Sequence, residues 1–208
     1  MKRQTLKEKI YHQIIDGIVS GAFKGGQVLT EQELMDLFQV SKAPVREALM
    51  ILSSEGIVEN IPRYGYRVIS FTIRHVEDIM EFRSVVEDYM LEKSFRRLIL
   101  DTSLNELKAL AKDSAGDNCD VWQHWDSNTL FHLKLASFAE NRYLYEQLQS
   151  AMNFLKLAYA QFYWSQWNQA SIPNDLKHHL RILQALEDKD LELAKVYLKK
   201  DLEDFCIR

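Results

Sequence analysis

Apolar residues at every fourth position predict that the chain opens with an amphipathic helix. They form one stripe along its buried face, made of Leu6, Ile10, Ile14 and Ile18. Gly21 is in a position to end this helix. Thr30 and Glu33 have the spacing of a capping box, in which each side chain bonds a backbone N–H of the other residue. This pattern predicts a short second helix over residues 31–38.

A third helix and a hairpin are expected to follow. Ser41 can cap the third helix, which runs to about Glu55. Two short runs of strand-like composition, Ile57–Ile61 and Tyr66–Ser70, flank the turn sequence Pro62–Gly65. Three helices followed by a hairpin is the element order of a winged helix-turn-helix, and only a short turn separates its second and third helices.

The rest of the chain has the pattern of long helices with few breaks. Six of the seven glycines lie at or before Gly65, so tight turns are confined to the first part. The apolar periodicity beyond it predicts six helices, over residues 73–99, 102–115, 120–139, 142–167, 172–188 and 190–206. We therefore predict a mainly α fold with two domains, a winged helix-turn-helix over residues 1–72 and an all-α six-helix bundle over residues 73–208.

Composition and charge narrow the function classes. Apolar residues make up 47% of the chain and charged residues 27%, which is typical of a globular protein. No apolar run is long enough to span a membrane and no leader opens the chain, so a cytoplasmic location is expected. Cys119 and Cys206 are too isolated for a zinc knuckle or a disulfide framework. Residues 1–70 carry nine basic and eight acidic side chains, so any DNA contact requires a local basic patch.

The third predicted helix carries such a patch. Lys42 and Arg46 are one turn apart in its N-terminal half, the part of a recognition helix that enters the major groove. Arginine can bond a guanine edge with two hydrogen bonds, and lysine can reach guanine or phosphate. Arg63 and Arg67 in the hairpin could contact phosphates or the minor groove. The alternative is that Lys42 and Arg46 are solvated charges on an ordinary helix.

Four polar residues of the second domain could surround a divalent ion. Asn128 and His132 are one turn apart on one helix. His179 and Asp201 each lie eleven residues from position 190, where two helices meet, so an antiparallel hairpin would place them side by side. Two imidazoles, a carboxylate and an amide oxygen make up a ligand set for such an ion. The alternative is that the histidines are hydrogen-bonded core or surface residues.

Arg83 is a candidate for binding an acidic ligand. It lies one turn before Glu87 on the first helix of the second domain, and its guanidinium could hold the carboxylate of an effector with two hydrogen bonds. The alternative is an ion pair between Arg83 and Glu87 within the helix. His124 and His178, close in sequence to the ligand candidates, are expected at the surface.

The first 70 residues carry several short motifs in order. They are Leu29-Thr-Glu-Gln-Glu-Leu-Met, Val40-Ser-Lys-Ala-Pro-Val-Arg-Glu-Ala-Leu, Leu52-Ser-Ser-Glu-Gly-Ile-Val and Tyr64-Gly-Tyr-Arg-Val. Over residues 5–70 these motifs resemble the DNA-binding domain of the GntR family. The resemblance implies that Lys42, Ala43 and Arg46 contact bases or backbone of operator DNA and that Gly65 lies at the wing tip. Gln32 stands where some relatives have a DNA-contacting arginine.

A looser resemblance covers residues 75–205. Its motifs are Asn128-Thr-Leu-Phe-His132, His179-Leu-Arg-Ile-Leu and Asp190-Leu-Glu-Leu-Ala, with Asp201 seven residues beyond Ala194. They resemble the FadR C-terminal domain (FCD), many members of which bind a metal through an aspartate and three histidines. Here Asn128 replaces the aspartate and Asp201 the final histidine. The resemblance implies one divalent metal ion, zinc, nickel or manganese, with a water-filled polar pocket as the alternative.

Together these features predict a ligand-responsive transcription regulator rather than an enzyme. We expect a homodimer that binds double-stranded operator DNA and has no membrane contact. Such a repressor would be released by a small organic or sugar acid that contacts the metal or Arg83. Two alternatives stay open: a metal-dependent hydrolytic enzyme built on the four polar residues, and an architectural DNA-binding protein without a sensor.

Overall fold

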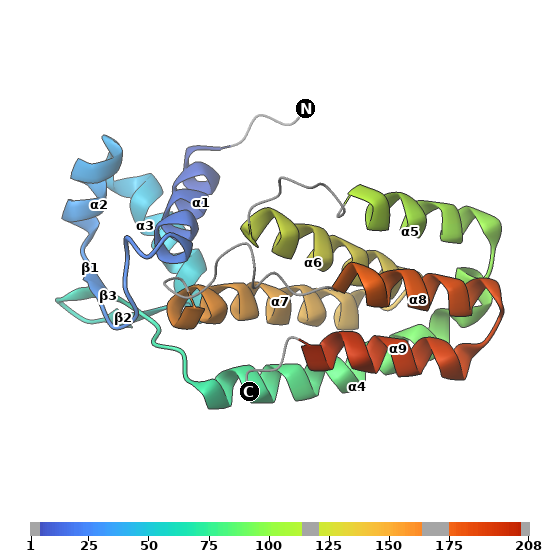
Figure 1. Ribbon diagram of the computed structural model, residues 1–208. Coiled ribbons are helices and arrows are strands. Elements are labelled where there is room, and N and C mark those ends of the chain that lie inside the picture. Colours follow the sequence, from blue (N-terminus) through green and yellow to red (C-terminus); the bar gives the residue numbers. More distant parts are fainter. Residues whose placement is uncertain (1–4, 114–120, 164–174, 205–208) are drawn as a thin grey trace. The chain divides into compact units, whose positions relative to one another are not determined.

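The structure, a computed structural model, describes residues 5–113, 121–163 and 175–204 (Figure 1). Within these ranges the chain forms nine helices and three short strands, which confirms the predicted mainly α fold. In chain order they are α1 (Leu6–Val19), β1 (Val28–Leu29), α2 (Glu31–Phe38), α3 (Lys42–Ser54), β2 (Val58–Ile61), β3 (Gly65–Val68), α4 (Ile73–Leu98), α5 (Asp101–Asp113), α6 (Val121–Ser137), α7 (Arg142–Tyr163), α8 (Asp175–Glu187) and α9 (Leu191–Asp204). The predicted helix ends at residues 114–115, 120, 164–167, 172–174 and 205–206 lie outside the described residues.

The described residues divide into two compact units. The first unit holds the described part of residues 1–72 and, in addition, residues 156–163 at the end of α7. The second holds residues 73–113, 121–155 and 175–204. Each unit buries apolar side chains of its own, and each is considered separately below.

The core of the first unit lies between α1 and α3. Ile10, Ile14 and Ile18 form the predicted stripe on α1 and are fully buried, as is Val45 on α3. Leu6 was expected in the same stripe but is 49% exposed, because it is the first residue of α1 and lies at the end of the packed face. Burial of this stripe fixes which side of α3 faces inward, and therefore which side faces solvent.

The start of α2 and the turn after it set the position of α3. Thr30 Oγ1 accepts a hydrogen bond from the backbone N–H of Glu33 at 3.1 Å, and Glu33 Oε2 accepts one from Thr30 N at 2.9 Å, which confirms the capping box. Gln39 ends α2 in the left-handed conformation with φ 54°. Ser41 then precedes α3 with an extended backbone, as expected, although its side chain forms no capping hydrogen bond within the described chain.

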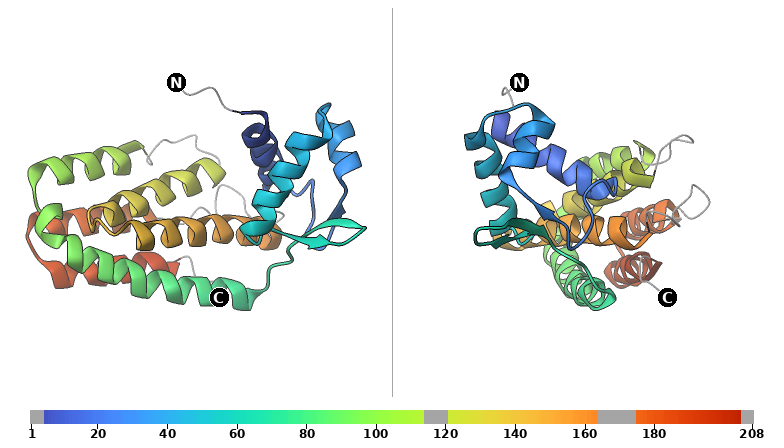
Figure 2. Two further views of the ribbon diagram at one scale, coloured as in Figure 1. Left: turned by 180° about the vertical axis from the view of Figure 1, so that it is seen from behind. Right: turned by 90° about the vertical axis from the view of Figure 1, so that its left-hand side faces the viewer.

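The three strands form one antiparallel sheet in the order β1-β3-β2. The β2–β3 hairpin projects from the helices of the first unit (Figure 2). Strand β1 is too short to show a strand pattern in the sequence, and it pairs Leu29 with Tyr66. Gly65 begins β3 with φ +132°, and a Cβ atom there would lie 2.5 Å from the carbonyl oxygen of Leu29. Only glycine therefore lets β1 approach β3 this closely.

The helices of the second unit run roughly alongside one another (Figure 2). A short turn at residues 188–190 connects α8 to α9, and these two helices pack side by side (Figure 1). Helix α9 also packs on α4. Two apolar clusters fill the interior, one around Phe131 and Ile182 and the other around Met90 and Met152. None of the described helices has both the length and the apolar composition that a membrane span requires.

Candidate functional site

The third helix presents two cations to solvent. The side chains of Lys42 and Arg46 are 61% and 60% exposed, whereas Val45 of the same helix is buried. Both cations bind the same carboxylate on α2, with 3.0 Å between Lys42 Nζ and Glu31 Oε2 and 2.9 Å between Arg46 Nε and Glu31 Oε1. The pair that the sequence predicts to contact DNA is therefore accessible, and Glu31, whose contact with both cations no local spacing indicates, joins its two members.

Two further residues with a predicted DNA contact lie near this pair. Ala43 follows Lys42 on α3 and is exposed. Gln32 is exposed on α2, and its Nε2 donates a hydrogen bond to Asp36 Oδ1 at 3.0 Å. Because Ala43 has a small side chain, it leaves room for another molecule to approach the N-terminal half of α3.

The hairpin holds the remaining predicted contacts. Arg63 lies in the turn between β2 and β3 with φ +71°, and Gly65 follows this turn at the start of β3. Arg67 Nη2 lies 2.9 Å from Glu59 Oε2, and the two residues are directly opposite each other in the sheet. Both side chains are about half exposed, so this ion pair is weak and leaves Arg67 able to change partners.

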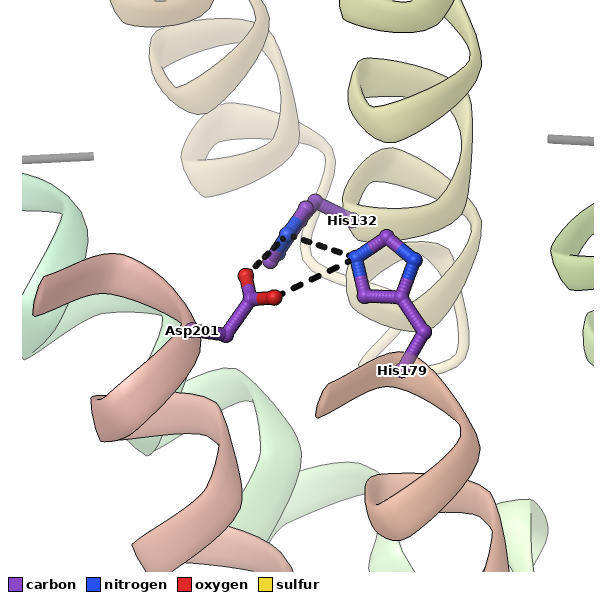
Figure 3. A group of neighbouring side chains, drawn as sticks. All are labelled: His132, His179 and Asp201. Carbon is purple, nitrogen blue, oxygen red and sulfur yellow. Dashed lines mark hydrogen bonds and ion pairs between the residues drawn. The ribbon is translucent and has the colours of Figure 1, made fainter. Parts of the chain in front are cut away.

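Three of the four predicted metal ligands converge in the second unit (Figure 3). His132 comes from α6, His179 from α8 and Asp201 from α9, and all three side chains are buried. Asp201 Oδ2 lies 2.9 Å from His132 Nε2, and Asp201 Oδ1 lies 3.6 Å from His179 Nε2. The two Nε2 atoms are 3.4 Å apart. One potential ligand atom of each residue thus lies within 4.8 Å of the others.

Two neighbours surround the imidazole of His179. Asn128, the fourth predicted ligand, is buried, and its Nδ2 lies 3.5 Å from His179 Nε2. A half-turn of this amide group would present its oxygen in place of its nitrogen. The ring of Phe131 stacks on the imidazole with centroids 3.8 Å apart and planes inclined by 16°, which fixes the plane of the His179 ring. Phe131 was not among the predicted site residues, because its apolar side chain gives only a core signal.

A chain of charges ties this polar cluster to α4. Glu87 Oε2 lies 2.6 Å from His132 Nδ1, and Glu87 Oε1 lies 2.7 Å from Arg83 Nε. Arg83 thus forms the ion pair that is one of its two predicted roles. Its side chain is 1% exposed, and its Nη2 has no hydrogen-bond partner among the described residues. The contact between Glu87 and His132 was missed, because it joins residues 45 positions apart.

The charges in this chain stabilise one another against burial. Desolvation raises the pKa of Glu87, but the charges of Arg83 and His132 outweigh this effect and lower the pKa to about 2. Desolvation lowers the pKa of His132, but the carboxylates of Glu87 and Asp201 raise it to about 9. Without a bound metal ion, the positively charged form of the His132 imidazole is therefore favoured at neutral pH; its Nδ1 donates to Glu87, and its Nε2 lies 2.9 Å from Asp201 Oδ2.

The polar interior extends beyond the predicted ligands. His124 and His178 were expected at the surface, but each is only 8% exposed. His124 lies one turn before Asn128 on α6, and His178 precedes His179 on α8. Both belong to helices that supply the cluster, so the packing of these helices buries further polar side chains.

The donor set fits a divalent cation. A histidine that ligates a metal usually donates its other ring N–H to a carboxylate or carbonyl, and Glu87 occupies that place on His132. Both oxygens of Asp201 face the two imidazoles and take no hydrogen bond from other described residues. Two imidazoles with carboxylate and amide oxygens suit zinc, nickel or manganese. His132, His179, Asp201 and Asn128 are therefore the residues that could hold such an ion.

Models of known protein families match both parts of the chain. The model described as bacterial regulatory proteins, gntR family, matches residues 6–68, and the model of the FCD domain matches residues 78–204. The chain belongs to the GntR family. It is a GntR-family transcription regulator with an FCD domain, and both predicted resemblances are confirmed. Its family is one of ligand-responsive DNA-binding regulators.

Individual relatives agree with this assignment. An uncharacterised HTH-type transcriptional regulator of Bacillus subtilis, YdhC, is 26% identical over 204 residues, which cover 95% of this chain and 88% of the relative. The gluconate operon transcriptional repressor of Bacillus licheniformis is 28% identical over 194 residues, covering 90% and 78%. The structure of E. coli McbR/YncC matches this chain with a TM-score of 0.79 at 22% identity. The match covers 97% of this chain and 95% of McbR/YncC, so the two proteins share a fold.

Replacing Glu87 with alanine should destabilise this GntR-family regulator by about 3–5 kcal/mol, because it leaves Arg83 buried without its counterion. Urea denaturation of the two proteins measures the difference. Asp78→Ala is the matched control, since Asp78 accepts from Arg74 at the same i,i+4 spacing on α4 but in solvent. That change should cost no more than about 1 kcal/mol. Equal losses for the two variants would show that the buried pair has no special weight.

Proposed function

We propose that this GntR-family regulator is a homodimeric repressor that leaves its operator when a small organic acid binds in its FCD domain. Residues 1–72 bind double-stranded DNA, and residues 73–208 bind the effector and form the dimer. A protein with two-fold symmetry reads a near-palindromic site, with each subunit on one half-site. The protein acts in the cytoplasm, where its DNA target lies.

The observation that carries the DNA-binding role is the exposure of Lys42 and Arg46 on α3 of a winged helix-turn-helix. Exposed ion pairs contribute little to stability, so DNA can compete for both cations. Arg46 reads a base edge in the major groove, and Lys42 binds guanine or phosphate. Backbone and minor-groove contacts supplement this reading, and they involve Gln32, Ala43, Arg63, Gly65 and Arg67.

The double variant Lys42→Ala/Arg46→Ala should lose selective DNA binding while keeping its fold. Fluorescence anisotropy with duplexes from upstream of its own and adjacent genes, at one fixed salt concentration, measures the affinity. We expect a loss of about 10–100-fold on the preferred duplex, since one good bidentate base contact is worth about 1–3 kcal/mol.

Lys93→Ala/Arg96→Ala removes the same two residue types from an exposed face of α4 and should bind the preferred duplex like the unmodified protein. The DNA-binding role is wrong if the unmodified chain prefers none of these duplexes, or if the Lys42→Ala/Arg46→Ala variant keeps the preference.

One divalent ion, zinc, nickel or manganese, binds between His132, His179 and Asp201 in this proposal, with Asn128 as a fourth ligand. The convergence of three buried donors and the carboxylate behind His132 support it. When bound, the ion would supply a positive charge that attracts an acidic effector. The alternative is a metal-free cluster in which protonated His132 bridges Glu87 and Asp201.

His179→Ala should abolish metal retention. After dialysis against each metal in turn and removal of the excess, elemental analysis should find one ion per chain in the unmodified protein and none in the variant. The metal should also raise the melting temperature of the unmodified protein only, because binding to the folded state alone is stabilising. His75→Ala removes an exposed histidine of the same unit and should leave both readouts unchanged. A metal-free unmodified protein under all three conditions would favour the protonated cluster instead.

An acidic effector follows from the unused donor of Arg83. A buried guanidinium N–H without an acceptor is costly, and a ligand carboxylate would satisfy it. The relative from Bacillus licheniformis is named for the gluconate operon, and gluconate is a sugar acid. Because Arg83 and its neighbours are buried, such an acid enters only if part of the bundle moves. That movement changes operator affinity when the acid binds one arrangement better than the other.

At least one small carboxylate from a panel that includes gluconate should weaken operator binding by about 5–150-fold at saturation, the usual range of allosteric coupling. Operator release monitored during titration measures this effect, and glucose is the uncharged control. Arg83→Lys keeps a cation beside Glu87 but lacks the second donor nitrogen, so release should need about tenfold more acid. An operator affinity untouched by every carboxylate would point to a DNA-binding protein without a sensor.

A further inference from the structure

Glu31 is the first residue of α2 and binds both cations of the proposed DNA-contacting pair. Its carboxylate spans the turn between α2 and α3, with 3.0 Å to Lys42 Nζ and 2.9 Å to Arg46 Nε. The side chain of Glu31 is only 18% exposed, compared with 61% and 60% for the two cations. The acid is therefore largely covered, and the cations that cover it face solvent.

We propose that Glu31 is a positioning residue for DNA recognition, which holds Arg46 and Lys42 for base reading and keeps them from binding arbitrary phosphates. This inference rests on the proposed DNA-binding role of the two cations. Glu31 acts through them and makes no contact with DNA itself.

The hydrogen bond from Arg46 to Glu31 leaves the reading edge of the guanidinium open. A guanidinium has five N–H donors in a rigid plane. Glu31 occupies Nε, and within the described part of the chain Nη1 and Nη2 make no hydrogen bond. These two nitrogens form the edge that can bond O6 and N7 of guanine. A side chain tethered at Nε also has fewer orientations to lose on binding, which lowers the entropic cost of recognition.

The negative charge of Glu31 weakens the attraction of the pair to the DNA backbone. With Glu31 ionised, the three side chains carry one net positive charge instead of two. Affinity that is independent of sequence grows with the number of phosphates that are neutralised. Glu31 thus lowers binding to arbitrary DNA while it supports the base contact, and both effects raise the ratio of specific to non-specific affinity.

Local structure keeps Glu31 ionised and in place. The N-terminus of a helix favours negative charge, and the capping box of Thr30 and Glu33 fixes where α2 begins. Burial raises the pKa of Glu31, but the hydrogen bonds from Lys42 and Arg46 lower it below its usual value. At neutral pH the carboxylate therefore accepts from both cations.

Glu31→Gln tests this role, because glutamine keeps the size of the side chain and removes its charge. The probe is a duplex that the unmodified protein selects in vitro from a random library, and a scrambled duplex of the same composition reports non-specific binding. Affinities are measured at several KCl concentrations. We expect the selected duplex to bind more weakly and the scrambled duplex more tightly, so that their affinity ratio falls about tenfold. For the scrambled duplex, the slope of log affinity against log KCl concentration should become steeper by up to about one unit, because Lys42 is then free to bind a phosphate and release one more counterion.

Glu47→Gln is the matched control. Glu47 is exposed on α3 and forms no ion pair within the described ranges, so its variant makes the same charge change without releasing the cations. The affinity ratio should then stay at the unmodified value. Circular dichroism melting confirms that both variants are folded.

Other outcomes overturn the proposal. If Glu31→Gln lost affinity equally for both duplexes, Glu31 would be a structural residue of α2. If it gained affinity equally for both, Glu31 would act only through its charge and not by positioning the cations. If the library yields no selected duplex, or if Lys42→Ala/Arg46→Ala keeps its preference for that duplex, the proposed function fails and this inference fails with it. A failure limited to Glu31→Gln leaves the proposed function intact.

Discussion

A carboxylate that is fully buried needs compensation for its lost hydration, and Glu87 obtains it from Arg83 on one side and His132 on the other. This constraint decides which atoms the FCD domain offers at its centre. Because Nδ1 of His132 is occupied by Glu87, only Nε2 faces Asp201 and His179. The orientation of the imidazole on α6 is thus set by a carboxylate on α4, and the rest of the polar cluster is arranged around it.

The DNA-binding unit also has a glutamate between two cations, but there the cations are exposed to solvent. Glu31 also lies between two cations, but Lys42 and Arg46 stay mostly exposed, so solvent screens the contact and the pair is easily redirected. In the FCD domain, burial makes the charges mutually dependent, and none can leave without a penalty. In both units a glutamate lies between two cations. The buried group in the FCD domain is a fixed framework, whereas the exposed cations of the DNA-binding unit are held in position but can still exchange partners.

Periodicity and spacing predicted the elements and much of the cluster. The equal distance of His179 and Asp201 from the turn placed them side by side, since both sit on regular helices joined by a short connection. The link between Glu87 and His132 was not predictable in this way, because the packing of α4 on α6 has no signature in local spacing. The prediction that His124 lies at the surface was wrong for a related reason. A histidine at a helical position can be exposed or buried, and only tertiary packing decides which.

The position of the carboxylate in the cluster bears on how sensing can work. Asp201 lies on α9, while the two imidazoles lie on α6 and α8, so three different helices supply these three donors. The distances between the three donors therefore depend on how α6, α8 and α9 are packed against one another. An ion or an acid that binds there gains most when all three donors converge, and interiors that are close-packed cannot adjust by small continuous shifts. Because each donor is carried by a different helix, an ion or acid that binds at this cluster ties α6, α8 and α9 together through their side chains.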